Sequence, residues 1–319
     1  MSSFLSLIRF PNLLIIAFTQ YMMRYAVLQP IIRFYGFDFQ MSSFTFFCLT
    51  LSTMCTAAAG YAINDYFDIK TDNINRPDEV IVGRNISRRK TVMIHIILSA
   101  AGILLGGYVT WRAGIPSLVF LYIFITGMLW LYSTTYKRQL LIGNLLVSLF
   151  TALVPLMVLL DIPPLNRTYY HQLIESGINF NLAIFWVLGF SVFAFLTTLS
   201  REIIKDAEDF EGDSAFGCHS IPITWGIEKT KMIIIGINTV IVGLLAFIYC
   251  KYLHYMLVHH FNYISFFYIL VLVILPMIWL SWLVFKAKES QDYRRAGNLL
   301  KLVMLSGILF GIFIRYSLL

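Results

Sequence analysis

Long apolar runs, separated by short polar breaks, recur along the whole chain. Each run is close to the roughly 20 residues that an α-helix needs to cross about 30 Å of hydrocarbon. Only 13% of the 319 residues are charged, which is about half the ~25% typical of soluble domains, and the mean hydropathy is +0.76. Because backbone in lipid must satisfy its own hydrogen bonds, each run is expected to be helical. The pattern predicts an all-α polytopic membrane protein and excludes a soluble globular domain.

The breaks between the apolar runs divide the chain into nine expected membrane-spanning helices. We expect them to form one domain over residues 1–319, a bundle whose central cavity opens at the cytoplasmic edge. The expected spans are 10–33, 43–65, 91–111, 115–135, 140–160, 181–204, 231–252, 263–285 and 297–317.

Basic residues are distributed unevenly between the two sides of such a bundle. With the amino terminus inside, eighteen of the 24 lysines and arginines fall on the cytoplasmic side and six on the other. Because cytoplasmic loops carry the excess of basic residues, this split predicts the orientation. Arg24 lies within the first apolar run, where it either snorkels to the far interface or lines a polar part of the cavity.

Two acidic stretches with the same spacing, D-x-x-D-x-x-x-D, follow the second and sixth runs, as NDYFDIKTD and KDAEDFEGD. On a helix turning about 100° per residue, each triplet falls within a sector of about 60°. Each is therefore expected to form one acidic stripe at the cytoplasmic end of its span. Carboxylates on one face repel one another, so a cation is expected to neutralise them. The two triplets are Asp65, Asp68 and Asp72, and Asp206, Asp209 and Asp213.

Three interpretations of these stripes are open. A solvated acidic loop is the simplest. A cation pathway of a transporter is the second, although such sites usually lie near the bilayer midplane. The third is a pair of Mg²⁺ sites that hold a diphosphate, since Mg²⁺ takes carboxylates and fills its octahedron with water and phosphate oxygens. A diphosphate beside an apolar interior suggests an isoprenoid substrate, whose allylic cation aromatic walls would stabilise.

The residues themselves resemble the UbiA superfamily of intramembrane prenyltransferases. NDYFDIKTDNINRP, from Asn64, is similar to its first signature, and REIIKDAEDFEGD, from Arg201, to its second. RFPN, from Arg9, and YSTTYKRQLLIGN, from Tyr132, resemble its helix-one opening and its loop between helices four and five. The resemblance implies nine transmembrane helices, Mg²⁺ as cofactor, and transfer of a prenyl group from a prenyl diphosphate to an acceptor.

The resemblance also implies roles for individual side chains. The residues expected to carry catalysis are Asp68, Asp72, Asp206, Asp213 and Lys137. The expected metal ligands are Asn64, Asp65, Asp68, Asp72, Asp206, Asp209 and Asp213. The expected substrate-binding residues are Asn64, Arg76, Arg84, Tyr132, Tyr136, Arg138, Arg201 and Lys205. For Arg201 and Lys205, an ion pair that supports Asp206 is an equal alternative.

The acceptor is less constrained than the donor. The stretch from Asn75 to Arg89 resembles most the members that prenylate geranylgeranylglyceryl phosphate, and it would place Arg76 and Arg84 at the acceptor's phosphate. An aromatic quinone precursor is the alternative acceptor, and a cation-coupled transporter the alternative from another class. The expected partners are the donor, a lipid-like or aromatic acceptor and membrane lipids, with no nucleic acid. The expected location is the cytoplasmic membrane of a bacterium or archaeon.

Two smaller patterns complete the analysis. Gly102 and Gly106 form a G-x-x-x-G motif, which predicts close helix packing. The four cysteines form no C-x-x-C, so we expect no disulfide framework.

Overall fold

The computed structural model describes residues 3–253 and 259–317, and every long element in them is a helix. The chain packs as two compact units, each described by itself below. The first comprises Met1–Tyr21, Phe37–Lys137 and Leu156–Asn181, and the second comprises Met22–Gly36, Arg138–Pro155 and Leu182–Leu319. The expectation of one domain over the whole chain stays a prediction.

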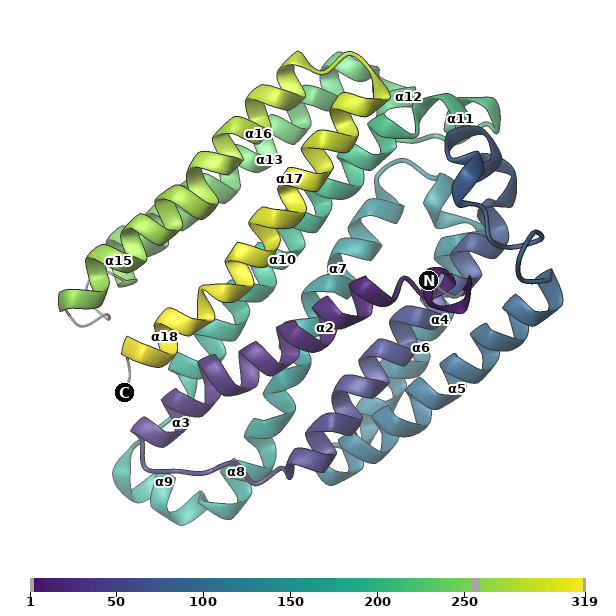
Figure 1. Cartoon of the computed structure of the whole chain (residues 1–319). Helices are drawn as coiled ribbons and strands as arrows, with labels where there is room; N and C mark the ends of the chain where they lie inside the picture. Colours follow the sequence, from purple (N-terminus) through teal and green to yellow (C-terminus); the bar gives the residue numbers. More distant parts are fainter. Residues whose placement is uncertain (1–2, 254–258, 318–319) are drawn as a thin grey trace. The chain divides into compact units, whose positions relative to one another are not determined.

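The longest element of the first unit is α4 (Figure 1). α4 packs against α5 and α6, and the short α1 also contacts it. The elements that lie wholly or mainly in this unit are α1 (Ser3–Leu7), α2 (Phe10–Met22), α4 (Ser43–Asn75), η2 (Pro77–Glu79), α5 (Arg88–Arg112), η3 (Pro116–Leu118), α6 (Val119–Thr134), η5 (Met157–Asp161), α8 (Ile162–Thr168) and α9 (Tyr170–Ser176).

The second unit contains the carboxyl-terminal half of the chain and two earlier segments. Its long helices α10, α13, α16 and α17 enclose a common apolar core. Its elements are η1 (Met23–Leu28), α3 (Gln29–Phe34), α7 (Ile142–Leu156), α10 (Asn181–Glu208), α11 (Phe210–Ala215), α12 (Ile221–Trp225), α13 (Ile227–Ile248), η6 (Tyr249–Leu253), α15 (His259–Ile269), η7 (Leu270–Ile274), α16 (Leu275–Lys286), α17 (Ser290–Leu309) and α18 (Gly311–Ser317). The bend η4 (Tyr136–Arg138) lies where the first unit passes into the second.

Eight helical stretches in the described residues are long and apolar enough to cross a membrane. They match the second to ninth expected spans, from Ser43–Asn75 to Ser290–Tyr316. The first expected span corresponds to α2, η1 and α3 in unbroken succession, with a π-helical turn in the middle. Arg24 lies in that turn and is only 1% exposed, which argues against snorkelling, one of the two alternatives open for it.

α4 extends beyond the expected membrane span of 43–65 and carries the whole first acidic stripe on one helix, as expected. Its start is capped by Ser42, whose hydroxyl accepts the backbone N–H of Thr45 at 3.1 Å. The apolar run ends near Asp65, where we placed the end of the span, but the helix continues to Asn75. The whole first acidic stretch is therefore helical.

Close packing on α5 confirms the G-x-x-x-G prediction. A Cβ on Gly102 would lie 2.5 Å from Oγ1 of Thr56, and one on Gly106 would lie 2.7 Å from the ring of Tyr122. The Ser52 hydroxyl donates to the Gly102 carbonyl at 2.6 Å, which only this close approach allows. The glycines thus let α4 and α6 approach the backbone of α5.

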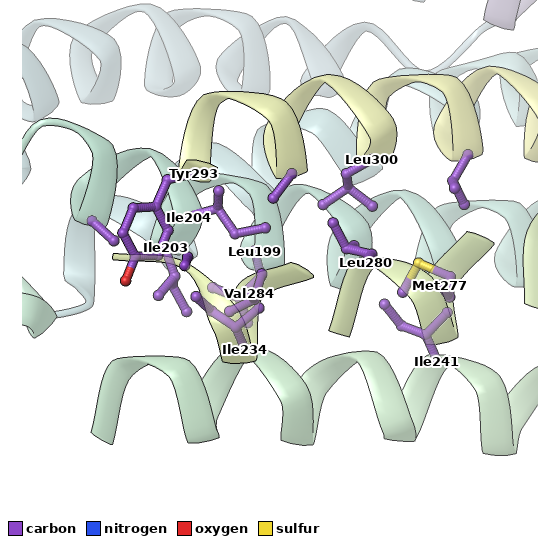
Figure 2. Packing of buried hydrophobic residues seen from close by; sticks show 14 of the residues in the cluster. Leu199, Ile203, Ile204, Ile234, Ile241, Met277, Leu280, Val284, Tyr293 and Leu300 are labelled. Atoms are coloured by element: carbon purple, nitrogen blue, oxygen red, sulfur yellow. The ribbon is translucent and has the colours of Figure 1, made fainter. Parts of the chain in front are cut away.

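The core of the second unit is an aliphatic layer with one polar crosslink. Figure 2 shows Ile203, Ile204 and Leu199 of α10 among side chains from α13, α16 and α17. Ser200 donates to the amide oxygen of Asn238 at 2.8 Å, and the Asn238 amide nitrogen donates to Ser281 at 3.2 Å. This chain joins α10, α13 and α16 within the apolar layer.

Candidate active site

The first acidic stretch forms a polar face on the last turns of α4. Asn64 donates to Oδ2 of Asp68 at 2.6 Å, one helical turn away. Both side chains are largely buried, and the Oδ1 atom of Asn64 has no hydrogen-bond partner. A buried amide oxygen without a donor is costly. This oxygen is therefore suited to accept a cation or a donor that binds beside Asp68.

Two cations neutralise this face, as the repulsion between its carboxylates requires. Lys137 pairs with Oδ2 of Asp68, and Nη2 of Arg9 pairs with Oδ1 of Asp65 at 2.9 Å. The guanidinium of Arg9 also lies 5.0 Å from the centre of the Tyr61 ring. Burial alone would lower the pKa of both bases, but Asp68 raises the pKa of Lys137 and Asp65 raises that of Arg9. Both therefore stay charged at neutral pH.

The backbone at Arg9 is held in an uncommon conformation. Its φ is +48°, in the left-handed region that side chains with a Cβ rarely occupy. Arg9 lies between α1 and α2, where this conformation turns the chain. Strain of this kind persists only where the surroundings enforce it, and here the ion pair to Asp65 provides such a contact.

The remaining expected substrate residues of the first unit lie around this face. Tyr132 and Asp72 are close enough to Lys137 to favour its charged form, and Tyr136 immediately precedes it in the same turn. Arg76 ends α4, with its N–H donating to the Asp72 carbonyl at 2.8 Å. Arg84 is exposed, and its guanidinium spans the loop by donating to the Pro77 carbonyl at 2.7 Å and to Oδ1 of Asn73 at 3.0 Å.

The second acidic stretch does not lie on one helix, so the expectation of a single stripe there is wrong. α10 ends at Glu208 and α11 begins at Phe210, with Asp209 at φ −90° and ψ 11° between them. Asp206 is thus on α10 and Asp213 on α11. The glycines at 212 and 217, close behind the break, favour a short second helix over a continued one. Spacing alone could not show this interruption.

Asp206 is held from another helix. The amide nitrogen of Asn144, on α7, donates to its Oδ2 at 2.8 Å. Glu202, Asp213 and Lys205 are its charged neighbours. Arg201 pairs with Glu202 at 3.0 Å, so the ion pair in the structure is not the one with Asp206 that we weighed for Arg201.

Arg138 makes a backbone contact within the second unit. Its carbonyl accepts the N–H of His219 at 2.9 Å, which ties the segment before α7 to the segment after Asp213. Leu141 follows with φ +62°, a second left-handed residue without glycine's freedom. This bend leads into α7, where Asn144 is placed one turn later.

Sequence reasoning missed two of these contacts. The sequence placed Arg9 only in RFPN and among the cytoplasmic basic residues, and Asn144 only at the end of YSTTYKRQLLIGN. Two signals were available in the sequence. Arg9 is a charged residue directly before an apolar run, and Asn144 is an amide near the start of another. Neither indicates which distant carboxylate the side chain will reach.

The oxygen atoms of these motifs fit a hard divalent cation by type, since carboxylates and an amide carbonyl are the ligands that Mg²⁺ accepts. In residues 3–253 and 259–317, no group of three histidine, cysteine or acidic side chains is assembled as a ligand set within this structure. Asp68 is instead paired with Lys137, Asp65 with Arg9, and Asp206 with Asn144.

Membrane-length helices, some of which end in carboxylates, amides and bases, define an integral membrane protein of the polytopic helical class. The sequence profile of the UbiA prenyltransferase family matches residues 34–305. The chain belongs to this family and is a prenyltransferase.

Relatives extend the comparison. The digeranylgeranylglyceryl phosphate synthase of Methanosphaera stadtmanae is 29% identical over 262 residues, covering 81% of this chain and 84% of that one. The enzyme of the same name from Thermococcus sibiricus is 32% identical over 191 residues, covering 58% of this chain and 59% of that one.

Solved structures share the fold. A structure of a digeranylgeranylglyceryl phosphate synthase has a TM-score of 0.61 at 21% identity, covering 97% of this chain and 98% of that one. A UbiA homologue from Archaeoglobus fulgidus, bound to DMAPP and Mg²⁺, has a TM-score of 0.54 at 16% identity, covering 97% and 99%. At these identities the likeness establishes the fold.

Proposed function

We propose that this protein transfers a prenyl group from a prenyl diphosphate to the hydroxyl of a membrane-associated glyceryl phosphate lipid, with Mg²⁺ as cofactor. The observation that carries the proposal is the polar face of α4, where Asn64, Asp68 and Lys137 converge. The names of its relatives support the acceptor class. The DMAPP and Mg²⁺ bound to the Archaeoglobus homologue support the donor and the metal.

In this proposal each aspartate motif holds metal through its own carboxylates, and the bases hold the diphosphate. Mg²⁺, when bound, would draw charge from the diphosphate and so favour its departure. Lys137 would exchange its pairing with Asp68 for the diphosphate oxygens, and Tyr132 or Tyr136 would donate to the same group. Asn144 would hold Asp206 in position.

The transfer breaks the bond between the prenyl C1 and the diphosphate oxygen. It forms a bond between that carbon and the acceptor's hydroxyl oxygen, and the hydroxyl proton is released. The acceptor's phosphate needs bases apart from those that hold the diphosphate, because two anions in one site repel one another. Arg76 and Arg84, in the loop after α4, are the bases we assign to it.

We also propose that the site faces the cytoplasm. The excess of lysine and arginine in the connections that carry both motifs supports this orientation.

The test is transfer by membranes that contain the protein. Radiolabelled prenyl diphosphates of several lengths are supplied with Mg²⁺ or with a chelator, against either a glyceryl-ether phosphate or an aromatic carboxylic acid. We expect Mg²⁺-dependent labelling of the ether lipid. If only the aromatic acid is labelled, the proposed glyceryl phosphate acceptor is wrong. If labelling persists in the presence of the chelator, the assignment of Mg²⁺ as cofactor is wrong.

Three variants sharpen this experiment. Asp68→Asn and Asp213→Asn should each lower transfer by more than about 100-fold, because each removes a proposed metal ligand. Asp78→Asn, an exposed acid in η2, is the matched control and should transfer normally. Normal turnover by Asp68→Asn would contradict the assignment.

A further inference from the structure

Glu208 is the last residue of α10 and lies between two aspartates of the second motif. The final carbonyls of a helix lack intrahelical partners. The carbonyl of Glu208 accepts the hydroxyl of Ser290 at 2.9 Å, and its carboxylate accepts Nε of Arg294 at 3.0 Å. One residue is thus fixed twice, through its backbone and its side chain, by a helix more than eighty residues away.

The helix that holds Glu208 is itself firmly placed. Glu289 and Asp292 form a reciprocal capping box at the start of α17. Tyr293 and Ala296 are buried in the apolar core with Ile203 and Ile204 of α10 (Figure 2). Gly297 also faces α10, since a Cβ there would lie at an ordinary contact distance of 3.8 Å from Ile204. The first turn of α17 is therefore a rigid support.

The contact between α17 and Glu208 lies within the second aspartate motif. The helix is interrupted at Asp209, immediately after Glu208, and Asp206 and Asp213 lie on either side of that interruption. Contacts that hold Glu208 in place also determine the residue at which α10 ends. They therefore determine the positions of Asp206, on α10, and Asp213, on α11, relative to each other. The Glu208 carboxylate is 12% exposed, so its pairing with Arg294 is shielded from solvent on the side of Glu208.

We propose that Ser290 and Arg294 are positioning residues for the second aspartate motif, acting through Glu208. They hold the end of α10 so that the interruption at Asp209 keeps one geometry. The inference rests on the proposed function, since it supposes that Asp206, Asp209 and Asp213 bind the metal.

The experiment compares Arg294→Ala with Arg295→Ala in the full-length protein. Arg295 is the neighbouring base, 75% exposed and 4.0 Å from Asp292, so it controls for charge and helix position. The first measurement is the Mg²⁺ concentration for half-maximal transfer, together with kcat and donor KM. The second is hydrogen–deuterium exchange of residues 206–213, with and without Mg²⁺, which does not depend on turnover.

We expect Arg294→Ala to raise the half-saturating Mg²⁺ concentration about tenfold, within the 10–100-fold range for residues behind metal ligands. Exchange of residues 206–213 should become at least several-fold faster, while exchange in α4 is unchanged. Arg294→Lys should restore part of both effects, and Glu208→Gln should resemble Arg294→Ala. Arg295→Ala should match the wild type in both measurements.

Several outcomes would overturn the proposal. If exchange of residues 206–213 becomes faster in Arg294→Ala but the half-saturating Mg²⁺ concentration does not change, the Arg294–Glu208 contact has only a structural role. If Arg294→Ala and Arg295→Ala have equal effects, the effect is not specific to the contact with Glu208. If the wild type needs no Mg²⁺, the proposed function fails, and the exchange measurement still decides whether Arg294 holds residues 206–213.

Discussion

Lys137 and Asp68 are 69 positions apart in the sequence, yet they form an ion pair that Asn64 joins from the next turn of α4. The two side chains are mostly shielded from solvent. Removing one of them would leave the charge of the other without a partner, which costs free energy of folding.

Replacing Lys137 by Met should lower kcat/KM for the prenyl diphosphate by at least about 100-fold, because a charge-assisted contact to the diphosphate is lost. Lys70→Met, on the exposed side of α4, should have no such effect. The measurement is initial rate against donor concentration at saturating Mg²⁺. If Lys137→Met leaves the donor KM and kcat unchanged, Lys137 does not belong to the diphosphate site.

The pH dependence of the Lys137 contact follows from the sign of its pKa shift. The Asp68 carboxylate raises the pKa of Lys137 above its ordinary value, even though burial opposes this. Its contribution to stability is thus fully present below the unfolded pKa of about 10.4 and is lost only above it. Thermal unfolding of wild type and Lys137→Met should therefore differ by a constant amount from pH 6 to 9. A difference that disappears in this range would contradict the assignment.

Two substitutions at Arg9 separate its charge from its backbone. Arg9→Ala and Arg9→Gly both remove the ion pair to Asp65, but only glycine suits φ +48° without strain. The glycine variant should therefore be more stable than the alanine variant by about 1 kcal/mol. Chemical or thermal unfolding in detergent measures the difference. An alanine variant at least as stable as the glycine variant would show that the turn is not strained.

Gly106→Ala should destabilise the first unit. Its new methyl group would meet the Tyr122 ring at 2.7 Å, and overpacking of this kind costs about 1–3 kcal/mol. Gly127→Ala in α6 is the control, because a Cβ there meets nothing within 4 Å and should stabilise the helix slightly. Thermal unfolding of both variants is the measurement. Equal stability of the two variants would contradict the close packing of α5 and α6.

Arg84→Ala should raise the acceptor KM about tenfold, which corresponds to about 1.4 kcal/mol, with little change in donor KM. Arg84 also stabilises the loop through hydrogen bonds to Pro77 and Asn73. The Arg84→Lys variant therefore separates the role of the charge from that of the two hydrogen bonds. Lysine keeps the charge but not the forked donor geometry. A rise in donor KM alone would assign Arg84 to the diphosphate site.

The orientation is tested by labelling. A cysteine at the exposed Glu79, in a background without the four native cysteines, should resist an impermeant reagent applied to sealed cells. A cysteine at the exposed Ser117, in the next connection, should react. The opposite pattern would reverse the topology.

The sequence by itself determined the class of this protein. Runs of apolar residues fix membrane-length helices because lipid leaves the backbone no other partners. The spacing of Asp65, Asp68 and Asp72 also sufficed to place them on one face, because one helix carries them all. These properties are local, so they can be read along the chain.

Only the tertiary structure decided which groups meet. Arg9 reaches Asp65 across 56 positions, Asn144 reaches Asp206 across 62 and Arg294 reaches Glu208 across 86. The break at Asp209 was likewise hidden, because the aspartate spacing is the same with or without it. Such pairings depend on how distant helices pack and where each one ends. These are set by the sum of many weak contacts rather than by any short stretch of residues.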